Sequence, residues 1–153
     1  MRPFRPAGEL VLGHNYGITF LRDGVADGTL PIARSAVDQP GVSRVLDMAV
    51  DGDGSVWLAA SETGLIRLDA DRRPHEVDLP ARPVVSVELD ARGRFWVASR
   101  NQLFESSSAG ASFTRVDHGQ RAAGGLRWLT AAADGRLFVS TDRGLLWPAG
   151  RLS

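Results

Sequence analysis

One short sequence pattern recurs along this chain of 153 residues. In its best-preserved copy, an apolar segment at 46–50 is followed by an aspartate–glycine turn at 51–54 and a second apolar segment at 56–60. A turn closing on Gly64 then leads into a third segment at 65–68. Two weaker copies follow and a fainter one precedes it, with first-turn glycines at Gly8, Gly54, Gly93 and Gly135. Successive copies are therefore 46, 39 and 42 residues apart (54 − 8, 93 − 54 and 135 − 93).

In the segment at 46–50, Leu46, Met48 and Val50 alternate with Asp47 and Ala49, which is the period-2 pattern of a β-strand. A repeat of roughly 40–50 residues holding several short strands is typical of a β-propeller, whose blades are four-stranded antiparallel sheets. We therefore expect an all-β single domain of about four blades, with repeats at roughly 1–41, 42–82, 83–121 and 122–153. The expected strands cover 9–13, 18–22, 29–34, 46–50, 56–60, 65–68, 76–79, 85–89, 95–98, 103–105, 113–116, 126–131, 137–140 and 145–147.

This strand count gives three, four, four and three strands, so the chain begins inside one blade and ends inside another. A blade buries both faces against its neighbours, and an open arc would expose apolar surface at its ends. A second chain could complete the ring as a homodimer with two-fold symmetry. Alternatively, the missing blades belong to further sequence, or four blades close into a ring alone with residues 2–5 supplying an outer strand.

The composition excludes several classes of function. The 18 basic and 18 acidic residues cancel, so no nucleic-acid-binding surface is predicted. The chain has neither lysine nor cysteine, which excludes Schiff-base chemistry and thiolate nucleophiles. No apolar run approaches the ~20 residues of a membrane span, so no membrane insertion is expected. Residues 1–6 lack the apolar core of a signal peptide, and the localisation is left unknown.

The second copy resembles the two-component-regulator propeller repeat, through Asp51, Asp53, Gly54, Trp57 and the Gly64–Leu65 pair. The third copy is similar to the related Ycf48-like and BNR propellers. Its match to their Asp-box hairpin rests on Ser106, Gly110, Ser112 and Phe113, with Ser108 in place of the aspartate. This resemblance implies a propeller over nearly the whole chain, and longer relatives are often extracytoplasmic. It implies no single activity, because such propellers serve sensor kinases, assembly factors, lectins and glycosidases.

The most conspicuous side chains have structural interpretations. Trp57 and Trp96, with Phe138 in the matching place, are expected to pack between blades. The acidic turn at 51–54 predicts a hairpin and not a calcium loop, because Val56 occupies the position that such a loop reserves for glycine. The three histidines lie far apart in non-equivalent parts of their repeats, which predicts no shared metal site. We expect no cofactor and assign no catalytic residue.

A ligand-binding face is predicted from position. In a propeller, the loops between the second and third strands of each blade share one face with the loops between blades. Arginines gathered there with other polar side chains would suit a carboxylate, a phosphate or a sugar. The candidates are His14, Asn15, Tyr16, Glu62, Arg82, Arg100, Asn101, Arg121, Asp142 and Arg143.

Two classes of function are compatible with this pattern. Regular repeats without a catalytic constellation favour a non-catalytic module, sensor-like or assembly-factor-like, that binds a protein or a small polar or anionic ligand. The alternative is a BNR- or sialidase-like glycan-active enzyme, or a remnant of one. The resemblance would route that chemistry through an arginine cluster and a tyrosine–glutamate pair, for which Arg5 and Tyr16 are available. Enzyme activity is left open, with the balance toward binding, and a structural remnant without ligand is the third possibility.

Overall fold

The computed structural model describes residues 9–32, 44–51, 53–106, 112–117 and 124–146. These residues contain fourteen β-strands and no helix, so no helical segment of the described part could cross a membrane.

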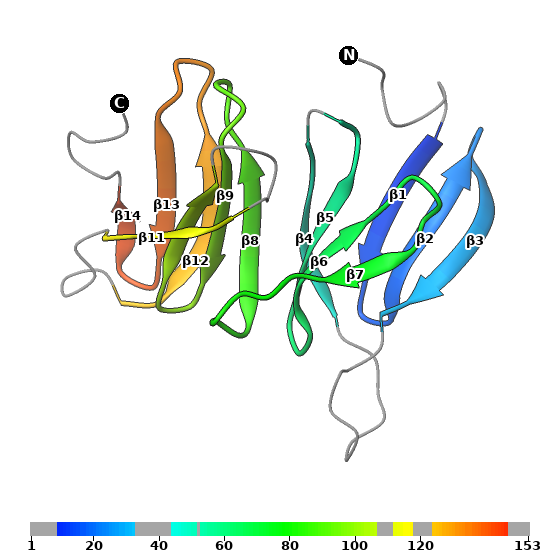
Figure 1. Cartoon of the computed structure of the whole chain (residues 1–153), viewed down its shortest axis with the longest axis horizontal. Helices are drawn as coiled ribbons and strands as arrows, with labels where there is room; N and C mark the ends of the chain where they lie inside the picture. Colours follow the sequence, from blue (N-terminus) through cyan, green and yellow to red (C-terminus); the bar gives the residue numbers. More distant parts are fainter. Residues whose placement is uncertain (1–8, 33–43, 52, 107–111, 118–123, 147–153) are drawn as a thin grey trace.

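The strands form four antiparallel sheets (Figure 1). The first sheet comprises β1 (Glu9–His14), β2 (Gly17–Arg22) and β3 (Val25–Pro31). The second comprises β4 (Val45–Val50), β5 (Val56–Ala60), β6 (Gly64–Leu68) and β7 (Pro74–Glu76). The third comprises β8 (Val84–Leu89), β9 (Phe95–Ser99), β10 (Leu103–Ser106) and β11 (Thr114–Val116), and the fourth β12 (Leu126–Ala131), β13 (Leu137–Thr141) and β14 (Gly144–Leu146).

Each expected strand overlaps an observed one, but two are displaced. β3 begins at Val25 and not at residue 29, because the preceding turn falls at Asp23 and Gly24, both with positive φ, and the expected Asp27–Gly28 turn lies inside the strand. β7 spans Pro74–Glu76 and not 76–79, because the chain turns at Arg72, which also has positive φ. Proline is tolerated in β7 because this strand lies at the edge of its sheet.

The four sheets follow one another as an open row. In Figure 1 the sheet of β1–β3 lies at one side and the sheet of β12–β14 at the other, with the remaining two between them. The innermost strand β8 packs against both β4 and β12, while β1 contacts β4. The closed four-bladed ring considered above is not formed by the residues that the structure describes.

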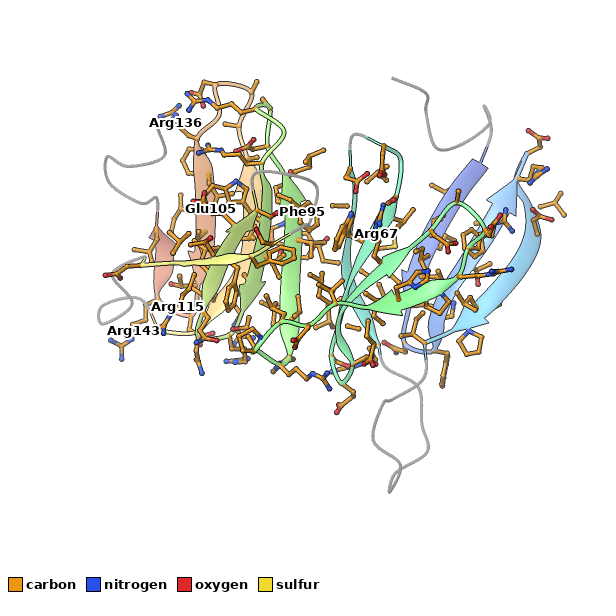
Figure 2. The ribbon with its side chains drawn as sticks, in the orientation of Figure 1. Arg67, Phe95, Glu105, Arg115, Arg136 and Arg143 are labelled. Atoms are coloured by element: carbon orange, nitrogen blue, oxygen red, sulfur yellow. The ribbon has the colours of Figure 1, made fainter. Side chains whose placement is uncertain are left out.

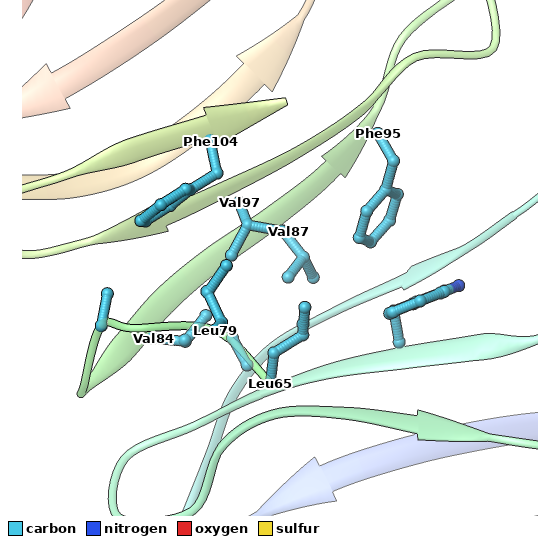
Figure 3. Packing of buried hydrophobic residues seen from close by; sticks show 10 residues of the cluster. Leu65, Leu79, Val84, Val87, Phe95, Val97 and Phe104 are labelled. Carbon is cyan, nitrogen blue, oxygen red and sulfur yellow. The ribbon is translucent and has the colours of Figure 1, made fainter. Parts of the chain in front are cut away.

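Apolar cores fill the spaces between consecutive sheets. Trp57 is buried between the second and third sheets, where its ring centroid lies 4.8 Å from that of Phe95. Leu65 of β6 points into the same cluster, among Val87 and Val97 of the third sheet (Figure 3). Trp96 is buried between the third and fourth sheets. Both tryptophans therefore pack between blades, as the sequence predicts.

Each of these tryptophans is also fixed by a buried hydrogen bond. The Trp57 indole donates to Asp51 at 2.6 Å, and the Trp96 indole donates to Asp90 at 3.0 Å. Asp51 and Asp90 stand at the start of the hairpin turns that precede the two tryptophans, and each also accepts backbone N–H groups of its turn. One carboxylate thus stabilises both the turn and the packing of its blade.

The fourth sheet replaces both partners of this pair. Its turn has the same backbone hydrogen bonds, from Gly135 N–H to the carbonyl of Ala132 and from Ala132 N–H to Arg136. The aspartate position holds Ala132, and the tryptophan position holds Phe138. The donor and the acceptor of this hydrogen bond are therefore both missing, so the replacement does not leave one of them buried without its partner.

The innermost strands share a further irregularity. In β4, the pairing with β5 passes from Val45 opposite Ala60 to Asp47 opposite Ala59, so Leu46 has no opposite residue. The same shift leaves Val85 unpaired in β8 and Arg127 unpaired in β12. These three β-bulges occupy equivalent places at the start of each strand, and such bulges commonly redirect a side chain.

Candidate functional site

The loops between the second and third strands of the blades lie at one end of the molecule, which we call the loop face. In the first sheet this loop joins β1 to β2, and in the others it joins β5 to β6, β9 to β10 and β13 to β14. All four lie along the lower edge of Figure 1. In Figure 2, Arg143 lies on the loop face, whereas Arg136 lies at the opposite end (Figure 2).

An open cavity of about 570 Å³ lies on the loop face, across the second, third and fourth sheets. The three bulge residues line it, so the shared irregularity of the innermost strands places one side chain from each sheet at the cavity wall. Trp128, which follows the last bulge, is 47% exposed and adds an aromatic surface. The complete lining is Arg44, Leu46, Ser61, Glu62, Pro83, Val85, Arg100, Arg127 and Trp128.

The backbone holds the cavity rim in place. Ser61 N–H donates to the carbonyl of Arg44 at 2.9 Å, and the Ser61 hydroxyl accepts the Arg44 N–H at 3.2 Å. Leu126 N–H donates to the carbonyl of Arg100 at 2.8 Å, which ties the third sheet to the fourth. The loops that carry the arginines are therefore tied to strand ends, and sites on such supports are held more precisely than sites on unsupported loops.

Three guanidinium groups surround the cavity. Arg100 forms an ion pair with Asp142 at 3.4 Å, and Arg127 pairs with the same carboxylate. The hydrogen bond from Arg127 is the main reason why the pKa of Asp142 lies below its ordinary value. For Arg44, no carboxylate partner is present among the described residues. Two arginines thus share one aspartate, which leaves positive charge at this rim beside the carboxylate of Glu62.

Several predicted candidates lie in or beside this cavity. Glu62 and Arg100 line it, and Asp142 holds two of its arginines. Arg82 precedes the lining residue Pro83 and pairs with Glu76 at 3.8 Å. Asn101 and Arg143 are exposed in the adjacent turns. The backbone N–H of each donates to a hydroxyl in its own hairpin, that of Ser99 and that of Thr141 respectively.

The remaining candidates are not brought to the cavity by this chain. His14, Asn15 and Tyr16 lie on the loop face of the first sheet, at the far side of the row. The His14 imidazole contacts the Thr19 hydroxyl at 3.1 Å and accepts the Tyr16 N–H at 3.2 Å. Arg121 lies outside the described residues.

Seven of the nine lining residues are not among the candidates predicted from the sequence. Besides Ser61 and Pro83, these are five residues at the innermost strands, namely Arg44, Leu46, Val85, Arg127 and Trp128. Arg44 directly precedes β4, while Leu46, Val85, Arg127 and Trp128 lie within the first three residues of an innermost strand, where the sequence predicts a strand and no site. A signal was available for the three bulge residues, because Leu46, Val85 and Arg127 each stand eight residues before the turn glycine of their repeat (54 − 46, 93 − 85 and 135 − 127). A bulge cannot be recognised from apolar alternation alone, since one additional residue reverses the inward and outward faces of a strand.

The structure also bears on the metal and catalytic alternatives. Among the described residues, no three histidine, aspartate or glutamate side chains gather as metal ligands. The Asp51 carboxylate is engaged by the turn and by Trp57, while Asp53 pairs with Arg67 at 3.0 Å. Tyr16 is far from the arginine-lined cavity, and Arg5 lies outside the described residues, as does most of the proposed Asp-box turn, residues 107–111.

Comparisons with known proteins identify the fold. No protein-family model and no curated protein sequence matches the chain. Solved structures do match. The extracellular domain of a putative hybrid two component system from B. thetaiotaomicron aligns over 94% of this chain with a TM-score of 0.71 and 14% identity. A WD40 β-propeller domain, that of Doa1, aligns over 94% of the chain with a TM-score of 0.66 and 14% identity. The chain has a β-propeller fold.

The propeller described here is shorter than the structures that it matches. It spans 20% of the two component system domain and 48% of the Doa1 domain. A streptogramin B lyase structure gives a TM-score of 0.68 at 17% identity, and 90% of this chain covers 46% of that one. The described sheets are therefore a partial ring, with the fold but not the full length of these neighbours.

Proposed function

We propose that this chain is a non-catalytic propeller module that binds a small polar or anionic ligand, or an anionic segment of a protein, on its loop face. The observation that carries the proposal is the cavity into which Arg44, Arg100 and Arg127 converge from three consecutive blades. Cavities of about 300–1,000 Å³ with a few convergent polar groups are the usual form of a ligand site.

The chemistry of the lining favours an anion. A guanidinium group presents a planar fork of N–H donors that matches the two oxygens of a carboxylate or phosphate. Arg44 is available for such a contact, while Arg100 and Arg127 can exchange part of their pairing with Asp142 for the ligand. Because the Asp142 ion pairs are exposed, each is worth little and can be exchanged at small cost. The exposed ring of Trp128 adds an apolar surface against which a sugar or peptide could pack.

A sensor or assembly scaffold is the biological role that fits such a module. Among the neighbours in fold, the B. thetaiotaomicron protein is the extracellular domain of a two component system. Another is PorZ of Porphyromonas gingivalis, a surface component of the type-IX secretion system, with a TM-score of 0.65 and 16% identity. These likenesses support a role in binding, with the ligand determined by this chain's own cavity. We treat residues 1–153 as one partial propeller domain and further propose that a second copy completes its ring.

Direct binding measurements test the cavity. Isothermal titration calorimetry of the purified chain with phosphate, citrate, glucuronate and N-acetylneuraminate should detect at least one anion that binds. Replacing Arg44 or Arg127 by glutamine should weaken that binding about tenfold or more, because a charge-assisted hydrogen bond contributes roughly 1.5–3 kcal/mol. The matched control is Arg136→Gln, since Arg136 also pairs with an aspartate but lies on the opposite face. Equal losses in all three variants would show that the cavity is not the site, and binding by none of the four anions would exclude this small-anion class.

A further inference from the structure

The outer face of the first sheet exposes positions that are core in every following sheet. Counted from the turn glycine of each repeat, Leu10 and Leu12 of β1 match Val56 and Leu58 of β5. Val56 and Leu58 are fully buried at 0% exposure, because the first sheet packs on them. Leu10 and Leu12 are 53% and 45% exposed. Their alternation with the buried Val11 shows a strand built to bury both faces, of which one is uncovered.

The fourth sheet is uncovered on the opposite side. Trp128, Ser140 and Leu145 stand opposite one another across β12, β13 and β14, so they form one row on its outer face. The equivalent row of the third sheet is fully buried under the fourth sheet, and it consists of Ser86, Ala98 and Leu103. In the fourth sheet, Trp128 is 47% and Leu145 is 61% exposed.

The two uncovered faces are equivalent to two faces that contact each other between consecutive sheets inside the chain. Within the chain, Leu65 and the next sheet's Val97 belong to one buried cluster between the two sheets (Figure 3). Leu145 is the counterpart of Leu65, and Leu12 is the counterpart of Val97. The contact that exists between consecutive blades inside the chain can therefore form again between the fourth sheet of one molecule and the first sheet of another.

We infer that the face of Leu10 and Leu12 docks on the Trp128–Ser140–Leu145 row of a second copy of this chain, and that the reciprocal contact closes the ring. The inference rests on the proposed completion by a second copy and names the surfaces that would meet. Each contact joins two different faces, and a two-fold axis makes both contacts identical. The choice of a second copy is supported by length, because one chain covers 46% and 48% of the two shorter neighbours, so two copies come close to one whole.

This docking also changes the ligand site. Trp128 belongs both to the cavity lining and to the uncovered row, so the second copy would wall the cavity on its open side. Loop-face turns of consecutive sheets lie close enough for Arg100 to pair with Asp142. By the same spacing, the turn at Asn15 and Tyr16 of the second copy would lie beside Asp142. Candidates that one chain separates would then form one composite rim.

Light scattering after size exclusion tests the inference on the full 153-residue chain. We expect a species of 32.8 kDa, twice 16.4 kDa. Leu12→Glu and Leu145→Arg should each raise the dimer Kd about 100-fold or more, because every dimer then buries two unpaired charges and each 1.4 kcal/mol is tenfold. Val25→Glu is the matched control, since Val25 is an exposed apolar residue at the β2–β3 turn. This variant should remain dimeric, and circular dichroism checks that all variants keep their strands.

Mixing the two disabled variants is the sharpest test. Each variant alone has two damaged contacts. A mixed pair has one native contact, between the unchanged Leu12 of one chain and the unchanged Leu145 of the other, and its other contact pairs the introduced carboxylate with the introduced guanidinium. The mixture should therefore recover a dimer under conditions where both variants are monomeric. A dimer that ignores both substitutions, or a mixture that stays monomeric, would refute the docking faces. A monomeric parent chain would refute the second copy itself, and neither result depends on anion binding in the cavity.

Discussion

The buried pair of Asp51 and Trp57 offers a quantitative test of how a blade is stabilised. The indole N–H donates to the carboxylate at 2.6 Å, and both side chains are buried. Ala132 and Phe138 occupy the equivalent positions of the fourth sheet, so the natural sequence contains the double replacement. We predict that Asp51→Ala and Trp57→Phe are each strongly destabilising, and that the double variant is much less destabilised than their sum.

The size of the effect follows from the contacts. Asp51→Ala leaves the buried indole N–H without an acceptor, which lowers the free energy of unfolding by roughly 1–3 kcal/mol. It also removes the acceptor of two turn N–H groups, so we expect a total loss of about 2–4 kcal/mol. Trp57→Phe loses apolar contact with Phe95 and leaves a buried carboxylate oxygen without its donor, at about 2–3 kcal/mol. The coupling between the two changes should equal the worth of a charge-assisted hydrogen bond, about 1.5–3 kcal/mol.

Equilibrium unfolding in urea measures this coupling. The four proteins of the double-mutant cycle are compared at one fixed concentration, because association would otherwise shift their apparent stability. Circular dichroism serves as the probe, since Trp57→Phe alters the fluorescence. Strictly additive losses, with a coupling below about 0.5 kcal/mol, would show that the hydrogen bond does not link the turn to the blade core and that Ala132 and Phe138 are unrelated replacements.

Two further predictions concern the turns. In urea unfolding, Gly17→Ala should destabilise the protein by at least about 2 kcal/mol more than Gly28→Ala. Both glycines have φ near +130°, but a Cβ at Gly17 would lie 2.3 Å from the Leu30 carbonyl oxygen, whereas a Cβ at Gly28 would meet open space. Equal losses of stability in the two variants would contradict this explanation. Burial opposes ionisation of Asp90, but hydrogen bonds from Trp96 and Arg94 outweigh it and hold its pKa below 3.8. Its stabilising contribution is therefore present above about pH 4 and is lost as the pH falls through the folded-state pKa. In the Asp90→Asn variant, the urea midpoint should therefore decrease less steeply below pH 4 than in the parent chain. An equally steep decrease in both proteins would refute this role of Asp90.

The repeat period and the alternation of apolar residues were sufficient to predict the strands. They also predicted that Trp57 and Trp96 pack between sheets, because these signals report burial directly. Local turn chemistry was a poorer guide at Asp27–Gly28, where glycine with positive φ lies inside β3. Dipeptides of this kind are compatible with a turn and with an irregular strand, and pairing with β2 decides between them.

The candidate site was predictable only in part. Loop residues such as Glu62 and Arg100 could be placed on one face from blade topology alone. The contribution of Arg127 could not, because it depends on a bulge whose position emerges from strand pairing. Tyr16 shows the converse limit. Its loop lies on the predicted face, but only the closure of a ring could bring it near the arginines, and closure is a property of the assembly.

The three bulges have a consequence for how this fold can diversify. Leu46, Val85 and Arg127 have no opposite residue in their sheets, so none is constrained by a cross-strand partner. All three nevertheless line the same cavity. Substitution at these sites can therefore alter the cavity wall without removing a cross-strand pair, and each duplicated repeat adds one more such position. The present set of leucine, valine and arginine is one combination among many that the same scaffold could carry.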